Sequence, residues 1–291
     1  PVGRLKGYSD GTTVVFGGSS GSSGAGTGSG TIGAPPPTQP MIVTAALSDG
    51  SLYAENLDRS AGIRIVPASG AGTAAEGALI RGTGTIRTGS NGERYLDTST
   101  LAVVGSGAID PLGLTTKPFY SGDYLYNAAN GAGQQGMIGG AGLTPVGLLV
   151  RTIGKVTDAQ ATTFSLTDGF SSGGFSKTVQ VSVPVGAVVP AVGSTVGVTG
   201  VVSTAKTANG LLPVLLTRRA SDIVTDLSSL QGTFTSPNGT LNTGDNLLAL
   251  PGVPFDPSPV SVLNHYTGTD GMGLLDRLNR YDAPTQSEVS W

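Results

Sequence analysis

The sequence predicts an all-β protein built from small closed barrels, and three observations in residues 148–223 lead to this fold class. The stretch contains five runs rich in β-branched residues, each bounded by Gly, Pro, Asn or Asp. Apolar and polar residues alternate with a period of two inside these runs, as in Val179, Val181 and Val183. The windows between the runs lack the spacing of an amphipathic helix. Short antiparallel strands in a stretch of this length are typical of a small closed barrel.

The predicted strands of this region follow one another closely along the chain. We place them at residues 148–158, 162–169, 177–184, 194–205 and 211–219. Asn209-Gly210 separates the last two, and this dipeptide favours a hairpin turn because Asn and Gly tolerate the positive φ angles that the turn requires. Residues 148–223 are therefore expected to fold as one barrel.

A second strand-rich region, residues 41–104, repeats this order of elements. Its predicted strands lie at residues 40–47, 51–56, 61–66, 78–88 and 93–104. Asn91-Gly92 separates the last two of them, as Asn209-Gly210 does in the other region. The shared order indicates a tandem duplication, with two five-stranded barrels in one chain.

Three further segments surround the predicted barrels. Residues 1–40 contain the β-prone run Thr12–Phe16 and a Gly/Ser-rich tract that would behave as a flexible coil in isolation. Residues 105–147 form a long Gly/Tyr-rich linker, and its aromatic residues suggest that it docks on a surface. Residues 224–291 are expected to form a small C-terminal β-rich module that ends in a hairpin around Asp282-Ala283-Pro284.

Composition excludes several kinds of chemistry and partner. The chain has no Cys, which excludes disulfides, thiol catalysis and zinc–thiolate sites. A formal net charge of −3 argues against nucleic acid as a partner. No apolar run reaches the roughly 20 residues that span a bilayer, so we expect no membrane insertion.

The patterns of a catalytic or cofactor site are also weak. His265 is the single His and no nucleophile-elbow sequence accompanies it, so we interpret it as a surface or packing residue. Gly28–Gly33 matches the dinucleotide-binding pattern, but Pro35-Pro36-Pro37 forbids the helix that such a site needs. Paired carboxylates are sparse, and the spacing of a calcium loop is absent. We predict no enzyme activity, no cofactor and no metal site.

Several stretches resemble a known fold family. Leu52–Val66, LYAENLDRSAGIRIV, resembles the passage from strand two to strand three in OB domains of secreted bacterial proteins, where an aromatic strand precedes a turn of the form D-R-S-x-G-I-R-V. TTFSLTDG at residues 162–169 and VGSTVGVTGVVST at residues 192–204 resemble the same group. The resemblance implies two tandem OB-like Greek-key barrels, and it leaves function open because OB barrels serve many purposes.

An OB barrel binds ligands on its second and third strands, and a face for single-stranded nucleic acid would carry stacked aromatic residues beside Lys or Arg. The candidates for such a face are Tyr53, Arg59 and Arg64 in the first barrel and Phe164 and Lys177 in the second. Each barrel has few of them, so the simpler interpretation is that Tyr53 and Phe164 belong to the core or rim. A secreted module that binds glycan or nucleic acid remains an alternative function.

Low charge, abundant small residues and the absence of site chemistry lead us to expect a structural subunit of an extracellular bacterial filament or surface array. The subunit would be secreted with its signal peptide removed, and it would assemble head-to-tail with further copies of itself in a pilus-like homopolymer. The residues expected at the joint between subunits are Val14, Val15, Phe16, Phe119, Tyr120, Tyr124, Tyr126 and Trp291.

Other interpretations stay open at this stage. Thr12–Phe16 could add as a strand to a neighbouring subunit, or it could start the first strand of its own barrel. The chain could also be an accessory domain of a secreted hydrolase. Asn238 lies in an N-glycosylation sequon, and a surface glycan is a second candidate partner.

Overall fold

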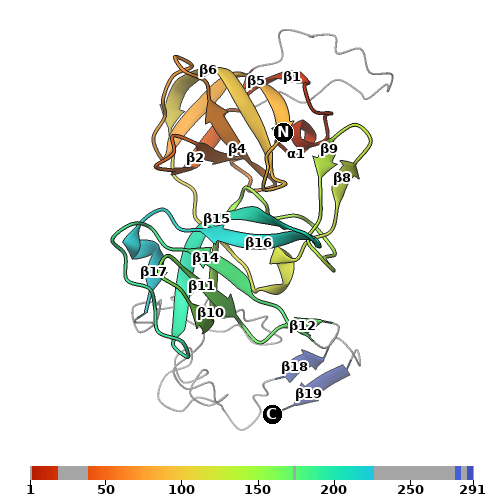
Figure 1. Ribbon diagram of the computed structural model, residues 1–291, viewed down its shortest axis with the longest axis vertical. Helices are drawn as coiled ribbons and strands as arrows, with labels where there is room; N and C mark the ends of the chain where they lie inside the picture. Colours follow the sequence, from red (N-terminus) through yellow and green to blue (C-terminus); the bar gives the residue numbers. More distant parts are fainter. Residues whose placement is uncertain (1, 19–38, 173–174, 226–278, 283–286, 291) are drawn as a thin grey trace, which may run out of the picture. The chain divides into compact units, whose positions relative to one another are not determined.

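The computed structural model describes residues 2–18, 39–172, 175–225, 279–282 and 287–290 (Figure 1). The chain divides into two compact units, Pro1–Thr225 and Asp226–Trp291. Within the described residues, α-helix is limited to the five residues of α1 (Val2–Lys6), and most of the remaining secondary structure is β-strand. The predicted all-β class is confirmed.

The first sheet closes on itself as a five-stranded barrel, drawn in orange and yellow in Figure 1. Its strands are β2 (Met41–Ala46), β3 (Leu52–Glu55), β4 (Gly62–Pro67), β5 (Ala78–Thr88) and β6 (Arg94–Ser106). Neighbours around the ring follow the order β2-β3-β4-β6-β5, and β5 pairs back with β2. Only the β4–β6 pair in this ring is parallel. The apolar residues that alternate along these strands fill the core, among them Ile63, Ile65, Ile80, Ile86 and Leu96.

The N-terminal segment adds one more strand to this barrel. β1 (Thr13–Phe16) pairs antiparallel with the part of β5 that β2 does not reach, from Thr13↔Thr85 to Phe16↔Gly82. The side chain of Phe16 is 1% exposed and joins the core. Gly82 leaves room for it, because a Cβ at that position would lie 2.7 Å from the Phe16 ring. In this structure the run Thr12–Phe16 therefore belongs to its own barrel.

The second sheet also closes on itself, with the same order of pairing. Its ring consists of β10 (Leu149–Ala159), β11 (Thr163–Thr167), β14 (Val179–Ser182), β15 (Thr195–Thr207) and β16 (Gly210–Leu216). Neighbours follow the order β10-β11-β14-β16-β15, β15 pairs back with β10, and the β14–β16 pair is parallel. The predicted alternation is confirmed, because Val179, Val181, Val196 and Val198 are buried in the core of this barrel. Two-residue strands, β7 (Leu112–Gly113) and β17 (Ile223–Val224), lie at the two ends of the sheet order.

The connection between the rings packs against the second barrel, as its aromatic residues suggested. It contains a 3-10 turn, η1 (Lys117–Phe119), and the hairpin β8 (Tyr124–Asn127) and β9 (Ala132–Gln134). Phe119 is completely buried in the core of the second barrel. The Tyr120 hydroxyl donates a hydrogen bond to the carbonyl of Thr178 at 2.6 Å. This part of the connection therefore belongs to the second barrel, whereas the side chain of Gln134, in β9, bonds with the backbone of Gly92 and Arg94 in the first.

The remaining described elements are short. β12 (Ser171–Ser172) pairs with β13 (Phe175–Ser176), and η2 (Ala220–Asp222) leads from the second barrel into β17. In the second unit, β18 (Asn279–Asp282) pairs antiparallel with β19 (Ser287–Ser290), which confirms the predicted C-terminal hairpin. Asn238, His265, Trp291 and the Gly/Ser tract lie outside the described residues.

Candidate functional site: the buried polar junction of the two barrels

Side chains from both rings meet in a small apolar cluster, which forms the centre of the junction. Ala45 and Tyr53 come from the first barrel, Leu149 and Val201 come from the second, and all four are buried. The backbones also touch nearby, since a Cβ added to Gly62 would lie 2.0 Å from the carbonyl oxygen of Gly147. The two rings therefore pack directly against each other within the first unit.

Glu93 lies in this junction with its carboxylate almost completely buried, at 1% exposure. Its Oε2 accepts hydrogen bonds from the Tyr53 hydroxyl at 2.8 Å, the Ser203 hydroxyl at 2.7 Å and the Asn91 side-chain amide at 3.3 Å. Its Oε1 has no hydrogen-bond partner within the described residues. Burial raises the pKa of Glu93, although the hydrogen bonds from Ser203 and Tyr53 and the nearby ammonium of Lys6 oppose that shift.

Lys6 enters the same junction from α1 and is 2% exposed. Its Nζ donates a hydrogen bond to the carbonyl of Val146 at 2.6 Å. Burial lowers the pKa of Lys6 to about 8, and the charge of Glu93 partly offsets this effect. The N-terminal helix, the first barrel and the connection thus share one buried polar cluster.

Arg94, the residue after Glu93, holds the N-terminal segment in a second way. Its guanidinium is 1% exposed and donates hydrogen bonds to Asp10, to the backbone carbonyls of Tyr8 and Gly131, and to the Thr88 hydroxyl. Burial lowers the pKa of Arg94, and the charge of Asp10 opposes that shift. A buried guanidinium with several acceptors fixes the position of each segment that supplies one.

Glu55, at the end of β3, is a second fully buried carboxylate in the junction. Its Oε2 accepts a hydrogen bond from the backbone N–H of Leu149, at the start of β10, at 2.9 Å. Its Oε1 has no hydrogen-bond partner within the described residues. Burial raises the pKa of Glu55 to about 7, against the opposing effects of the Leu149 hydrogen bond and the charge of Arg59.

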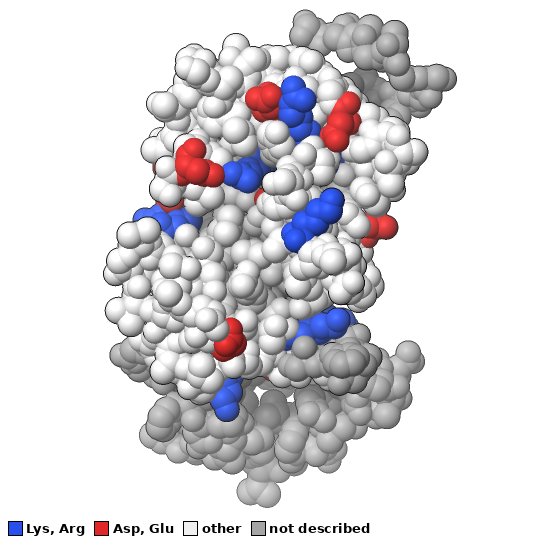
Figure 2. Space-filling view, viewed as in Figure 1, with Lys and Arg blue, Asp and Glu red and all other residues white. Residues whose placement is uncertain are grey.

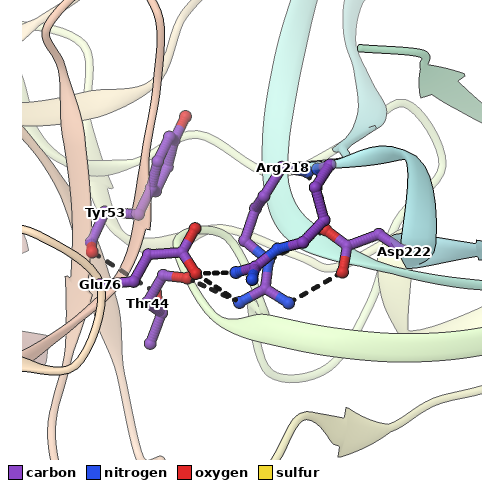
Figure 3. Close-up of polar contacts among 6 residues, drawn as sticks. Thr44, Tyr53, Glu76, Arg218 and Asp222 are labelled. Atoms are coloured by element: carbon purple, nitrogen blue, oxygen red, sulfur yellow. Dashed lines mark hydrogen bonds and ion pairs between the residues drawn. The ribbon is translucent and has the colours of Figure 1, made fainter. Parts of the chain in front are cut away.

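Arg218 connects the end of the second barrel to β2, as Figure 3 shows. Its guanidinium donates to both oxygens of Asp222 at 2.9–3.0 Å, to the carbonyl of Thr44 at 3.0 Å and to Glu76 at 3.5 Å. Arg219 also pairs with Glu76. The guanidinium of Arg218 thus donates hydrogen bonds to both barrels and connects them at this edge of the junction.

The buried charges of the junction bond with groups from both barrels and from the segments beside them. Glu93, Lys6 and Glu55 are buried among protein atoms, and a general acid or base must be able to reach its substrate. Among the described residues no cluster of three or more His, Asp or Glu side chains is arranged to hold a metal ion. A shallow pocket of about 220 Å³ lies elsewhere, lined by Gly122, Asp123, Gln135–Gly140 and Asn209–Leu211.

The five residues considered for an OB ligand face are not brought together on an exposed surface. Tyr53 is buried in the junction, and Phe164 is buried in the core of the second barrel. Arg64 pairs with an aspartate, while Arg59 has a positive φ of 58° and donates to a backbone carbonyl. The ammonium of Lys177 lies 4.8 Å from the centre of a tyrosine ring. These positions correspond to packing and local turn roles.

The residues expected at a subunit joint fall into two groups. Phe16, Phe119 and Tyr120 are buried, so their side chains offer little surface to another molecule. Val15 is 57% exposed and Tyr126 is 38% exposed, while Val14 and Tyr124 are half-buried. Trp291 lies outside the described residues. Of the eight expected positions, Val15 and Tyr126 are thus the described ones that present most surface.

Several of the charged side chains on the face drawn in Figure 2 lie beside a side chain of opposite sign, and this face shows no basic stripe. Within the described residues no helix has the length and apolarity needed to cross a membrane. Comparison with protein-family models and with curated proteins found no match.

Proposed function

We propose that this chain is a non-enzymatic structural subunit that assembles with copies of itself outside a bacterial cell, and that its body consists of two OB barrels in tandem. The order of pairing supports the tandem assignment. In both rings the third strand pairs in parallel with the fifth, and the fourth pairs back with the first. That order is the one we expect of a five-stranded OB barrel.

The observation that carries the proposal is the burial of Tyr53. This residue lies on the second strand of the first ring, where an OB barrel would present an aromatic residue to a ligand. Here its side chain is 0% exposed and its hydroxyl is bonded to Glu93. The first ring uses this part of its surface to hold the second ring, which favours a structural role over ligand binding.

The second ring supports the same conclusion. On its second and third strands, Phe164, Leu166 and Val181 point into the core, and the residues between them are polar and small to medium in size. That face lacks the aromatic platforms on which bases stack. A body of two barrels joined by buried polar contacts suits a subunit that bears mechanical load or sets the spacing between neighbouring copies in an assembly.

The proposal is tested by the mass of particles formed by purified full-length chain. Light scattering over a broad concentration range is expected to give a mass that grows with concentration, because a head-to-tail contact that does not close continues to add subunits. A particle that keeps the mass of one chain over the whole range would contradict self-assembly. Single-stranded nucleic acid and soluble glycans serve as comparison ligands, and tight binding of either would favour the alternative function.

A further inference from the structure

The N-terminal arm, residues 2–18, occupies a site that is built for its sequence. The site consists of the free stretch of β5 opposite β1, the space beside Gly82 that receives Phe16, and the buried charges of Glu93 and Arg94. The arm is the outermost strand of the first sheet order, so its removal would leave the five-membered ring paired as before. We call this site the arm acceptor.

Charge complementarity makes the arm acceptor selective. The arm brings the ammonium of Lys6 to the region of the Glu93 carboxylate, and it brings Asp10 to the guanidinium of Arg94. Both acceptor charges are 1% exposed in the docked state. An occupant that lacked these two opposite charges would leave buried charges without compensation, which is strongly unfavourable. The acceptor therefore selects the arm sequence itself.

The connection between the arm and its barrel is long enough to serve another copy. Residues 17–40 separate β1 from β2. A chain of this length reaches at most about 80 Å at full extension. Docking of the arm within its own chain and docking on a neighbour would use the same contacts. Docking within the chain or on a neighbour then depends on the concentration of subunits relative to the effective concentration of the tethered arm.

We propose that the arm of one copy docks in the arm acceptor of the next copy, so that arm exchange is the joint of the assembly. This inference rests on the proposed self-assembly and names its contact surface and its partner, a second copy of this chain. Because arm and acceptor are different surfaces, the contact is heterologous, and repetition that does not close into a ring gives an open chain of subunits. The polar contacts of Lys6 and Arg94 define the register in which each subunit joins the next.

Cysteine trapping tests the joint directly, since the chain has no Cys of its own. Val15 and Thr83 are directly opposite each other in the β1–β5 pairing. Val15→Cys and Thr83→Cys chains are prepared separately, mixed at a concentration where particles have formed, allowed to exchange and then oxidised. Arm exchange predicts covalent dimers that contain one chain of each kind. The double variant, Val15→Cys/Thr83→Cys, is expected to give a ladder of covalent multimers on a non-reducing gel.

The controls distinguish a failure of arm exchange from a failure of self-assembly. If particles grow but the double variant crosslinks only within single chains, arm exchange is wrong and self-assembly stands. Covalent dimers of Val15→Cys alone that match the yield of the mixture would also overturn arm exchange, because they would indicate edge-to-edge contact of β1. If neither growth nor intermolecular crosslinks occur at any concentration, both proposals fail.

A peptide competitor gives an independent readout without altering the subunit. A synthetic peptide of residues 2–18 should occupy free acceptors and lower the mean particle mass several-fold at saturation. The matched control is the same peptide with Lys6→Glu, which places a second negative charge near Glu93 and is expected to leave the particle mass unchanged. Equal effects of the two peptides, or no effect of either on growing particles, would contradict the acceptor site.

Discussion

Glu55→Gln tests the buried carboxylate between β3 and β10. The substitution keeps the size of the side chain, and the amide oxygen can still accept the hydrogen bond from the N–H of Leu149. It removes the negative charge at every pH. The comparison of the two proteins over pH therefore isolates the titration of Glu55.

The magnitude follows from the shift in pKa from 4.5 to about 7. The folded state binds the proton of Glu55 more tightly than the unfolded state does. Its contribution to stability is therefore fully present below pH 4.5 and is lost as the pH rises through 7. Each pKa unit corresponds to about 1.4 kcal/mol, so the loss between pH 4 and pH 8 is about 3 kcal/mol. The variant is expected to lack this loss.

The measurement is urea unfolding followed by far-ultraviolet circular dichroism at pH 4, 6 and 8. The free energy of unfolding of Glu55→Gln, relative to the unchanged chain, should rise by about 3 kcal/mol from pH 4 to pH 8. A constant offset from the amide cancels in this difference. Asp158→Asn, at an exposed carboxylate, is the control for the removal of one carboxylate charge as such. A parallel pH dependence of the unchanged chain and Glu55→Gln would refute the reasoning.

Two further substitutions probe the junction through its backbone and its hydrogen bonds. Gly62→Ala places a Cβ 2.0 Å from the carbonyl oxygen of Gly147, so it should lower the free energy of unfolding by about 1–3 kcal/mol. Gly113→Ala is the control, because its Cβ would have no heavy atom within 4 Å, and it should change the free energy of unfolding little. Equal midpoints of urea unfolding for both variants would argue against close backbone contact. Tyr53→Phe removes a donor to the buried carboxylate of Glu93 and should cost about 1.5–3 kcal/mol in the same assay, and an unchanged midpoint would show that this hydrogen bond does not stabilise the junction.

Local sequence patterns were sufficient to predict the strands of both rings. Alternation places Val179 and Val181 on one side of β14, and the structure buries both, while Gln180 between them stays exposed. The hairpin at Asn209-Gly210 was predicted from two residues, and the structure has a hairpin there, with Gly210 at a φ of 131° as the first residue of β16 and paired with Thr207 of β15. These features depend on neighbours within a few residues, which is why a single sequence contains the necessary information.

The junction could not be predicted in the same way, because it depends on residues that are distant in the sequence. Glu93 and Ser203 lie 110 positions apart; Glu93 directly precedes β6, and Ser203 lies within β15. Their burial arises only because two completed barrels pack together. Arg94 was missed for the same reason, since its acceptors Tyr8, Asp10 and Gly131 are also distant in the sequence.

The packing of the aromatic residues of the connection was predicted only in part. Their density indicated docking on a surface, and Phe119 is buried in the second barrel. The sequence did not reveal that this surface belongs to the same chain, because an apolar side chain carries no information on the identity of the partner it packs against. A joint between subunits that used Phe119 or Tyr120 would require these buried side chains to leave the second barrel.

Electron microscopy of the purified full-length chain, at concentrations where scattering reports growth, is the most direct test of the structural role. The account predicts filaments or ordered arrays with one repeating unit per chain, and it predicts that they are absent when the arm, residues 2–18, is deleted from a chain that keeps its β-rich circular dichroism spectrum. Uniform single particles of one chain at every concentration would contradict the central claim. Filaments that persist without the arm would leave self-assembly in place and move the joint to another surface.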